Sequence, residues 1–123
     1  MTTALWCVLV AGLLPYAAVL LAKAGAGFDN NNPRDWLAKQ EGYRRRANAA
    51  QANSFEAFPL FAVAVVVAHM LHGPQGRVDL YAMIFIAARI AYLGSYVADL
   101  AWLRSLAWLV GIVCAVTIFV TGV

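Results

Sequence analysis

Residues 4–22 read ALWCVLVAGLLPYAAVLLA, a run without a charged side chain that ends at Lys23. An α-helix rises 1.5 Å per residue, so this run would form a helix of about 28 Å, close to the thickness of the hydrocarbon core of a bilayer. The run therefore predicts a membrane-spanning helix. A cleavable signal peptide is the alternative, but no positive charge precedes the run and no clean small-x-small cleavage site stands before Lys23.

Three further apolar runs follow the first. Residues 55–71 are interrupted by Glu56, residues 80–97 by Arg89, and residues 106–123 carry no charge. Backbone groups in lipid must be hydrogen-bonded within the protein, and these runs do not alternate as barrel strands do. The sequence therefore predicts an all-α integral membrane protein, with a single domain over residues 1–123 that forms a four-transmembrane-helix bundle.

Composition excludes the main alternatives. The chain has 123 residues, of which 63% are hydrophobic and only 12% charged, whereas ordinary soluble domains are about 25% charged. A soluble domain of this size could not bury so much apolar surface, and a chain this apolar is not disordered. Nucleic-acid binding is not supported, because the basic residues are expected at a membrane face.

The distribution of basic residues predicts the orientation. Six of them lie between the first two runs, and Arg104 lies just before the last. The positive-inside rule places these segments in the cytoplasm and both termini on the opposite side. Asn32 and Pro33 form a helix-start signal, from which we expect one helix to continue into the second run. The expected helices lie near residues 4–22, 33–71 with a cytoplasmic extension, 80–97 and 103–123.

Polar residues interrupt two of the predicted helices. Arg46, Asn53 and Glu56 share one helix face, and Arg89 shares a face with Tyr92 and Tyr96. An arginine at the centre of a membrane helix costs about 2.5–3.5 kcal/mol on insertion scales, so it normally has a partner. Glu56 is the first candidate counter-ion for Arg89.

The depth of the two charges leaves two interpretations open. Helix rise separates Arg89 and Glu56 by about 8–10 Å along the membrane normal. An anionic ligand could bridge that separation, or the two residues could form a purely structural pair that fixes the register of the helices. No acidic or sulfur cluster accompanies His69 and His72, so we expect no metal site.

Two stretches resemble a known family. QANSFEAFPLF, from Gln51 to Phe61, resembles the second-helix signature of the MAPEG family, the membrane-associated proteins of eicosanoid and glutathione metabolism. ARIAYLGSY, from Ala88 to Tyr96, resembles the third-helix segment of the leukotriene-forming members. The chain looks like a bacterial branch of this family, which implies a multi-pass protein of the bacterial inner membrane.

The resemblance also implies a site. It implies a homotrimer that binds glutathione, as a co-substrate, between neighbouring subunits near the cytoplasmic face. In the family an arginine just before the fourth helix activates the thiol, and Arg104 is its nearest equivalent in this sequence. The residues implied to bind the tripeptide are Arg46, Asn53, Glu56, Arg89, Tyr92 and Tyr96.

Two departures from the family pattern stand in the sequence. Ala49 occupies the position of the motif's arginine, so either Arg46 or a neighbouring basic residue takes that role. The interval from Tyr96 to Arg104 is one residue longer than in the leukotriene-forming members, which leaves open whether Arg104 faces the pocket.

The function implied is a membrane-bound glutathione-dependent transferase or peroxidase. It would act on lipophilic small molecules that reach it through the membrane lipid, and an arginine would stabilise the thiolate. The sequence does not choose between transferase and peroxidase chemistry, since both use the same thiolate. The alternative is a non-catalytic protein of the same fold that binds lipid or glutathione.

Overall fold

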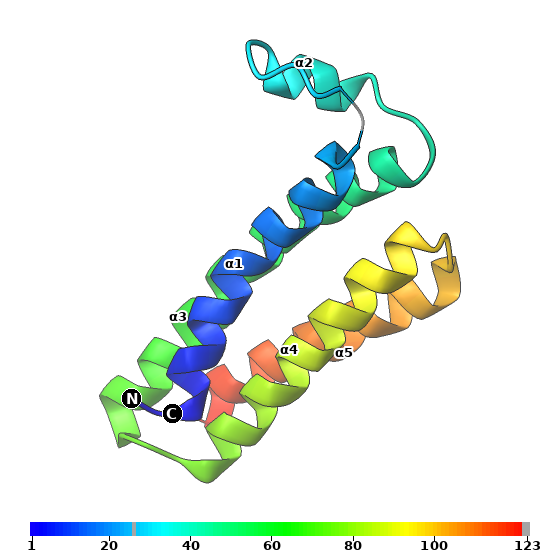
Figure 1. The fold of residues 1–123 in the computed structure, drawn as a ribbon. Helices are drawn as coiled ribbons and strands as arrows, with labels where there is room; N and C mark the ends of the chain where they lie inside the picture. The colour runs from blue at the N-terminus through cyan, green and yellow to red at the C-terminus, as the bar shows by residue number, and fades with distance from the viewer. Residues whose placement is uncertain (26, 122–123) are drawn as a thin grey trace.

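The computed structural model describes residues 1–25 and 27–121, and all of its regular structure is helical. The elements are α1 (Thr3–Lys23), α2 (Pro33–Ala38), α3 (Gly42–His72), α4 (Gly76–Val97) and α5 (Ala101–Thr121). Figure 1 shows the four long helices, with the short α2 beyond one end of them. That end of the bundle is called the α2 end below, and the other the far end.

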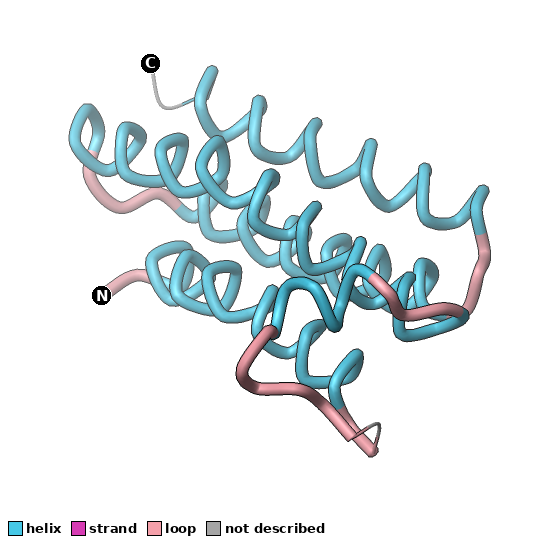
Figure 2. The backbone as a smooth tube through the Cα atoms, turned by 90° about the horizontal axis from the view of Figure 1, so that it is seen from above, coloured by secondary structure: helices cyan, strands magenta, loops and turns pink. Residues whose placement is uncertain are grey.

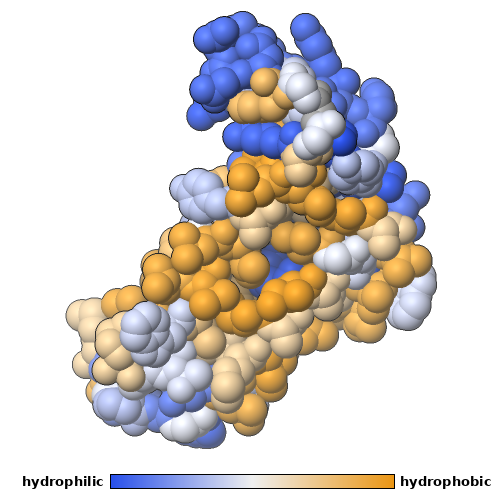
Figure 3. Space-filling view, in the orientation of Figure 1, coloured by the Kyte–Doolittle hydropathy of each residue, from blue (hydrophilic) through white to orange (hydrophobic). Residues whose placement is uncertain are grey.

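The four long helices are able to cross a membrane. Each contains an 18-residue window with a mean hydropathy between 1.5 and 2.3. Figure 3 shows apolar side chains over the middle of one face, with hydrophilic side chains gathered around α2 and at the far end. The prediction of an all-α, four-span membrane protein is confirmed, and the chain is a multi-pass membrane protein.

The long helices pack as two antiparallel pairs. α1 packs mainly on α3, and α4 packs mainly on α5. The four run roughly side by side when seen from above (Figure 2). Because consecutive long helices reverse direction, α3 and α5 both run from the α2 end to the far end, while α1 and α4 run the other way (Figure 1).

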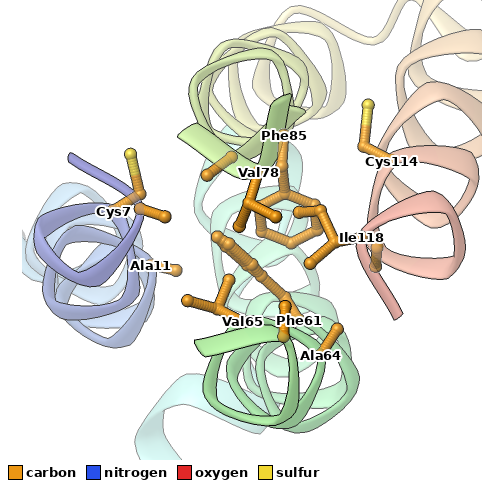
Figure 4. Close-up of a cluster of buried hydrophobic side chains, with 13 residues drawn as sticks. Cys7, Ala11, Phe61, Ala64, Val65, Val78, Phe85, Cys114 and Ile118 are labelled. Atoms are coloured by element: carbon orange, nitrogen blue, oxygen red, sulfur yellow. The ribbon is translucent and has the colours of Figure 1, made fainter. Parts of the chain in front are cut away.

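The main hydrophobic core lies towards the far end of the bundle. Phe61 and Phe85, from α3 and α4, are fully or almost fully buried, and their ring centroids are 3.9 Å apart. Ile118 of α5 packs against them, and Cys7 and Ala11 of α1 complete one side (Figure 4). This core joins the two helix pairs and leaves the polar residues nearer the α2 end.

The expected continuous helix over residues 33–71 is wrong, because the chain breaks between α2 and α3. The backbone N–H groups of Lys39 and Gln40 bond to carbonyls three residues earlier and close α2. Gly42 then begins α3 with a φ of +63°, a left-handed conformation that favours glycine. The expected cytoplasmic extension is therefore two helices joined by a turn.

Two other boundaries differ from expectation by a few residues. α4 begins at Gly76 rather than near residue 80, because Asp79 lies in its first turn instead of before it. α5 begins at Ala101, and the final residues of the expected helix over 103–123, residues 122 and 123, lie outside the described residues.

Candidate functional site

Arg89 is the centre of the polar cluster inside the bundle. Its side chain projects from the middle of α4 and is only 3% exposed. The Nη2 atom donates a hydrogen bond of 2.8 Å to Oδ1 of Asn53 on α3. The guanidinium also stacks over the ring of Tyr92, 4.2 Å from its centroid. The buried cation is therefore held by a neutral amide and an aromatic face.

Glu56 reaches this cluster through Asn53. The Nδ2 of Asn53 donates to Oε2 of Glu56 at 3.3 Å, while its Oδ1 accepts from Arg89. Among the residues that the structure describes, the one ion pair joins Arg45 to Glu41, at 3.6 Å. Glu56, the first candidate counter-ion, therefore forms no direct ion pair with Arg89, and the amide of Asn53 connects the two side chains through hydrogen bonds.

Ser54 is a member of the cluster that sequence reasoning missed. It is 5% exposed, and its Oγ donates a hydrogen bond of 2.8 Å to the carbonyl of Ala50. That bond leaves the oxygen free to accept from Nη2 of Arg89, 3.5 Å away. The signal available in the sequence was a serine next to Asn53 at the entrance to an apolar run.

A cavity of about 230 Å³ opens beside this cluster, between α3, α4 and α5. Polar side chains line one part of it, and apolar side chains line the rest. The lining residues are Asn53, Glu56, Ala57, Leu60, Phe85, Arg89, Trp108, Gly111, Ile112 and Ala115. Of the predicted site residues, the cavity therefore brings together Asn53, Glu56 and Arg89.

The two predicted tyrosines connect Arg89 with Arg104. The rings of Tyr92 and Tyr96 meet edge to face, with centroids 5.7 Å apart. The guanidinium of Arg104 lies 4.7 Å from the centroid of the Tyr96 ring. Two aromatic rings thus lie between two cations, and each ring has one guanidinium over it.

Arg104 lies just outside the cavity. Its position on α5 is one turn before Trp108, which lines the cavity, so the two residues share a helix face. The side chain is held over Tyr96 and does not itself line the cavity.

Arg46 is placed at a helix end rather than in the cavity. Its Nε donates a hydrogen bond of 3.1 Å to the carbonyl of Val97, the last residue of α4. Arg44 does the same for α1, since its Nη1 donates to the carbonyls of Ala22 and Ala24 at 3.2 and 2.6 Å. Cations at these positions complement the negative ends of the helix dipoles.

The donor set suits a small zwitterionic ligand better than a metal ion. The part of the chain that the structure describes contains no group of three His, Cys, Asp or Glu side chains able to hold a metal. The cavity instead presents a guanidinium, an amide and a carboxylate within a membrane-spanning segment.

Comparison with known proteins identifies the family. The model of the MAPEG family matches residues 3–123, which is almost the whole chain. No curated protein and no solved structure matches the chain in the corresponding comparisons. The match takes in all four membrane-spanning helices and every residue of the polar cluster, and the chain therefore belongs to the MAPEG family.

Proposed function

We propose that this MAPEG protein is a membrane-bound glutathione-dependent transferase or peroxidase that acts on lipophilic electrophiles. The observation that carries the proposal is the cavity lined by the buried Arg89, the half-buried Asn53 and the exposed Glu56, all on helices long and apolar enough to span a membrane. Membrane helices rarely contain such residues unless they contact a ligand or one another.

The polar residues fit the groups that glutathione carries. At neutral pH the tripeptide has two carboxylates, one ammonium and a thiol. Arg89 and Asn53 offer donors to a carboxylate or a peptide carbonyl, and Glu56 is an acceptor for the ammonium. Tyr92 and Tyr96 do not line the cavity, but their rings lie between the guanidinium groups of Arg89 and Arg104.

Arg104 is proposed to favour the thiolate. A free thiol has a pKa near 8.5, and a neighbouring guanidinium stabilises the deprotonated form. In the transferase reaction a carbon–sulfur bond forms while the bond to the leaving group breaks, and the thiol proton passes to water. Arg104 acts by turning from the Tyr96 ring towards the cavity that begins one turn further along α5.

We also propose a homotrimer in the bacterial inner membrane, with the α2 end in the cytoplasm and both termini on the other side. Residues 23–46, with their basic residues, and the start of α5, with Arg104, support this orientation, because these segments lie at the α2 end (Figure 1). The trimer rests on family membership.

A non-catalytic glutathione or lipid binder is the second candidate. It is favoured by the position of Arg104, whose guanidinium stacks on Tyr96 outside the cavity lining. A protein in which that arginine stays on the tyrosine would bind the tripeptide without activating its thiol.

Two measurements on the detergent-purified chain test the proposal. Glutathione is expected to raise the midpoint of thermal unfolding, and turnover of a model aromatic halide or a lipid hydroperoxide is expected to exceed the uncatalysed rate. Stabilisation without turnover favours the non-catalytic binder. A midpoint that does not respond to glutathione, in protein that is folded, contradicts both candidates.

A further inference from the structure

Arg89 lies between two spaces of different kinds. On the α5 side it lines the cavity described above, which has a volume of about 230 Å³. On the α1 side it lines a narrow gap that leaves no room for a water molecule. Apolar side chains such as Leu14 and Phe58 line this gap, together with the hydroxyl-bearing Ser54. The side chain of Arg89 therefore has an open side towards the cavity and a closed side towards α1.

Asn53 and Ser54 contact the same nitrogen of Arg89 from these two sides. Asn53 lines the cavity, and Ser54 lines the gap. Both accept from Nη2 of Arg89, with separations of 2.8 and 3.5 Å. Neighbouring residues of an α-helix point about 100° apart, so the two oxygens meet Nη2 from different directions. Each nitrogen at the end of a guanidinium has two N–H groups, and each oxygen can accept from one of them.

The hydroxyl group of Ser54 is oriented by its own helix. It donates to the carbonyl of Ala50, one turn earlier, at 2.8 Å. Because its hydrogen is used in this way, the oxygen is left to accept from Arg89. Since the gap has no room for water, no solvent molecule can take the place of this oxygen.

The two bonds use one nitrogen of Arg89 and leave the others available. Among the residues that the structure describes, the hydrogen bonds of Arg89 all involve Nη2. Nη1 keeps two N–H groups, which can donate to a carboxylate or a peptide carbonyl. The ring of Tyr92 covers one face of the guanidinium, 4.2 Å from its centroid. The guanidinium is thus held at one nitrogen and on one face.

We propose that Ser54 is a positioning residue for glutathione binding. Together with Asn53 it holds Nη2 and thereby directs Nη1 of Arg89 into the cavity, where Nη1 donates to a carboxylate of the tripeptide. This role rests on the proposed function, because it requires glutathione in that cavity. Ser54 does not touch the ligand itself, since it lines the gap and not the cavity. Without its hydroxyl group the guanidinium would keep Asn53 but could turn about that one bond.

Titration of glutathione into the detergent-purified protein tests this role. Ser54→Ala is expected to weaken glutathione binding about fivefold, because a hydrogen bond that orients a charged group is lost. Ser95→Ala is the matched control and is expected to leave the affinity unchanged. Ser95 of α4 is 3% exposed, and its hydroxyl group also donates to the carbonyl four residues earlier.

Two variants of equal size separate the hydroxyl group from packing. Ser54→Thr and Ser54→Val introduce side chains of the same shape, of which threonine alone has a hydroxyl group. Any strain from the added methyl group is common to both. The threonine variant is therefore expected to bind glutathione about fivefold more tightly than the valine variant. Thermal unfolding without glutathione establishes that both are folded.

Arg89→Lys tests whether Ser54 acts through the guanidinium. Lysine has no Nη2, so adding Ser54→Ala to Arg89→Lys is expected to change the remaining glutathione affinity by less than about twofold. In turnover, Ser54→Ala should raise the KM for glutathione. The kcat at saturating glutathione and its pH profile should stay unchanged, because Arg104 is the residue proposed to act on the thiol.

The outcomes distinguish this role from the proposed function. Unchanged affinity in Ser54→Ala, equal affinity of the threonine and valine variants, or a full loss in the Arg89→Lys background overturns the positioning role. A similar loss in Ser95→Ala also overturns it, because the effect would then not be local. In each of these cases the unaltered protein still binds glutathione, and the proposed function stands. Failure of the unaltered, folded protein to bind glutathione contradicts both.

Discussion

The guanidinium of Arg89 is hydrogen-bonded to Asn53, and Asn53 is in turn hydrogen-bonded to Glu56, at 2.8 and 3.3 Å. A single amide therefore separates the two opposite charges and satisfies both. Its oxygen can only accept and its nitrogen can only donate, so the direction of this chain of hydrogen bonds is fixed.

Asn53→Leu is expected to destabilise the protein by about 2 kcal/mol, because it leaves a buried guanidinium without its main acceptor. The free energy of unfolding in mixed micelles measures this, with Asn48→Leu as the control on the same helix. Adding Arg89→Met to Asn53→Leu is expected to restore part of the stability, since it removes the unpaired charge. If the double variant is no more stable than Asn53→Leu, the hydrogen bond between the two residues does not carry the effect.

Arg104→Ala is expected to reduce turnover on the order of 100-fold while the affinity for glutathione changes little, because its proposed role is to stabilise the thiolate. The remaining activity should rise with pH up to the ordinary thiol pKa near 8.5, since deprotonation then depends on solution pH. Arg77→Ala at the far end is the control. An unchanged rate in Arg104→Ala would remove this residue from the mechanism.

Arg46→Gln is expected to lower stability by about 1 kcal/mol, because the carbonyl of Val97 loses its donor at the end of α4. Arg45→Gln is a close control, as the neighbouring side chain is 72% exposed and paired only with Glu41. Thermal unfolding and glutathione titration should be measured on both variants. Weaker glutathione binding at unchanged stability would place Arg46 in the ligand site instead, as the family motif suggests.

Asp79→Ala is expected to loosen the start of α1 and cost about 1 kcal/mol, because Oδ1 of Asp79 accepts a hydrogen bond of 2.8 Å from the backbone N–H of Ala4. Cys7, buried one turn further along α1, should then react faster with a membrane-permeant thiol reagent. Cys114 on α5 is the internal reference. Asp79→Asn keeps the acceptor and should behave almost as the unaltered protein, and equal reactivity of Cys7 in all three proteins would argue against this cap.

The sequence predicted the spans and the polar cluster well, because both follow from local patterns. Charge-free runs of helical length are enough to indicate membrane helices, and residues three, four or seven apart must share a helix face. Asn53, Glu56 and Arg89 were recognised in this way, and the structure places all three along one cavity.

The remaining features depend on tertiary geometry that no local pattern contains. The break before α3 depends on a positive φ at Gly42. The sequence alone does not show which glycines adopt a positive φ and which continue a helix. The intervening amide of Asn53 and the helix-end role of Arg46 depend on which atoms of distant helices come into reach. The spacing of polar residues along the helix singled out Arg46. It could not show whether Arg46 binds a ligand or a backbone carbonyl.

Three consecutive basic residues lie near the start of α3, namely Arg44, Arg45 and Arg46. They bear on both the membrane topology of the chain and the packing of its helices. Arg44 and Arg46 donate hydrogen bonds to backbone carbonyls at the ends of α1 and α4, the two helices that end at the α2 end. Two of the three basic side chains thus link the ends of other helices to the start of α3, while Arg45 pairs with the nearby Glu41. Because basic residues next to a span bias its orientation, Arg44 and Arg46 are positioned to affect both the insertion of the chain and the packing of its helix ends.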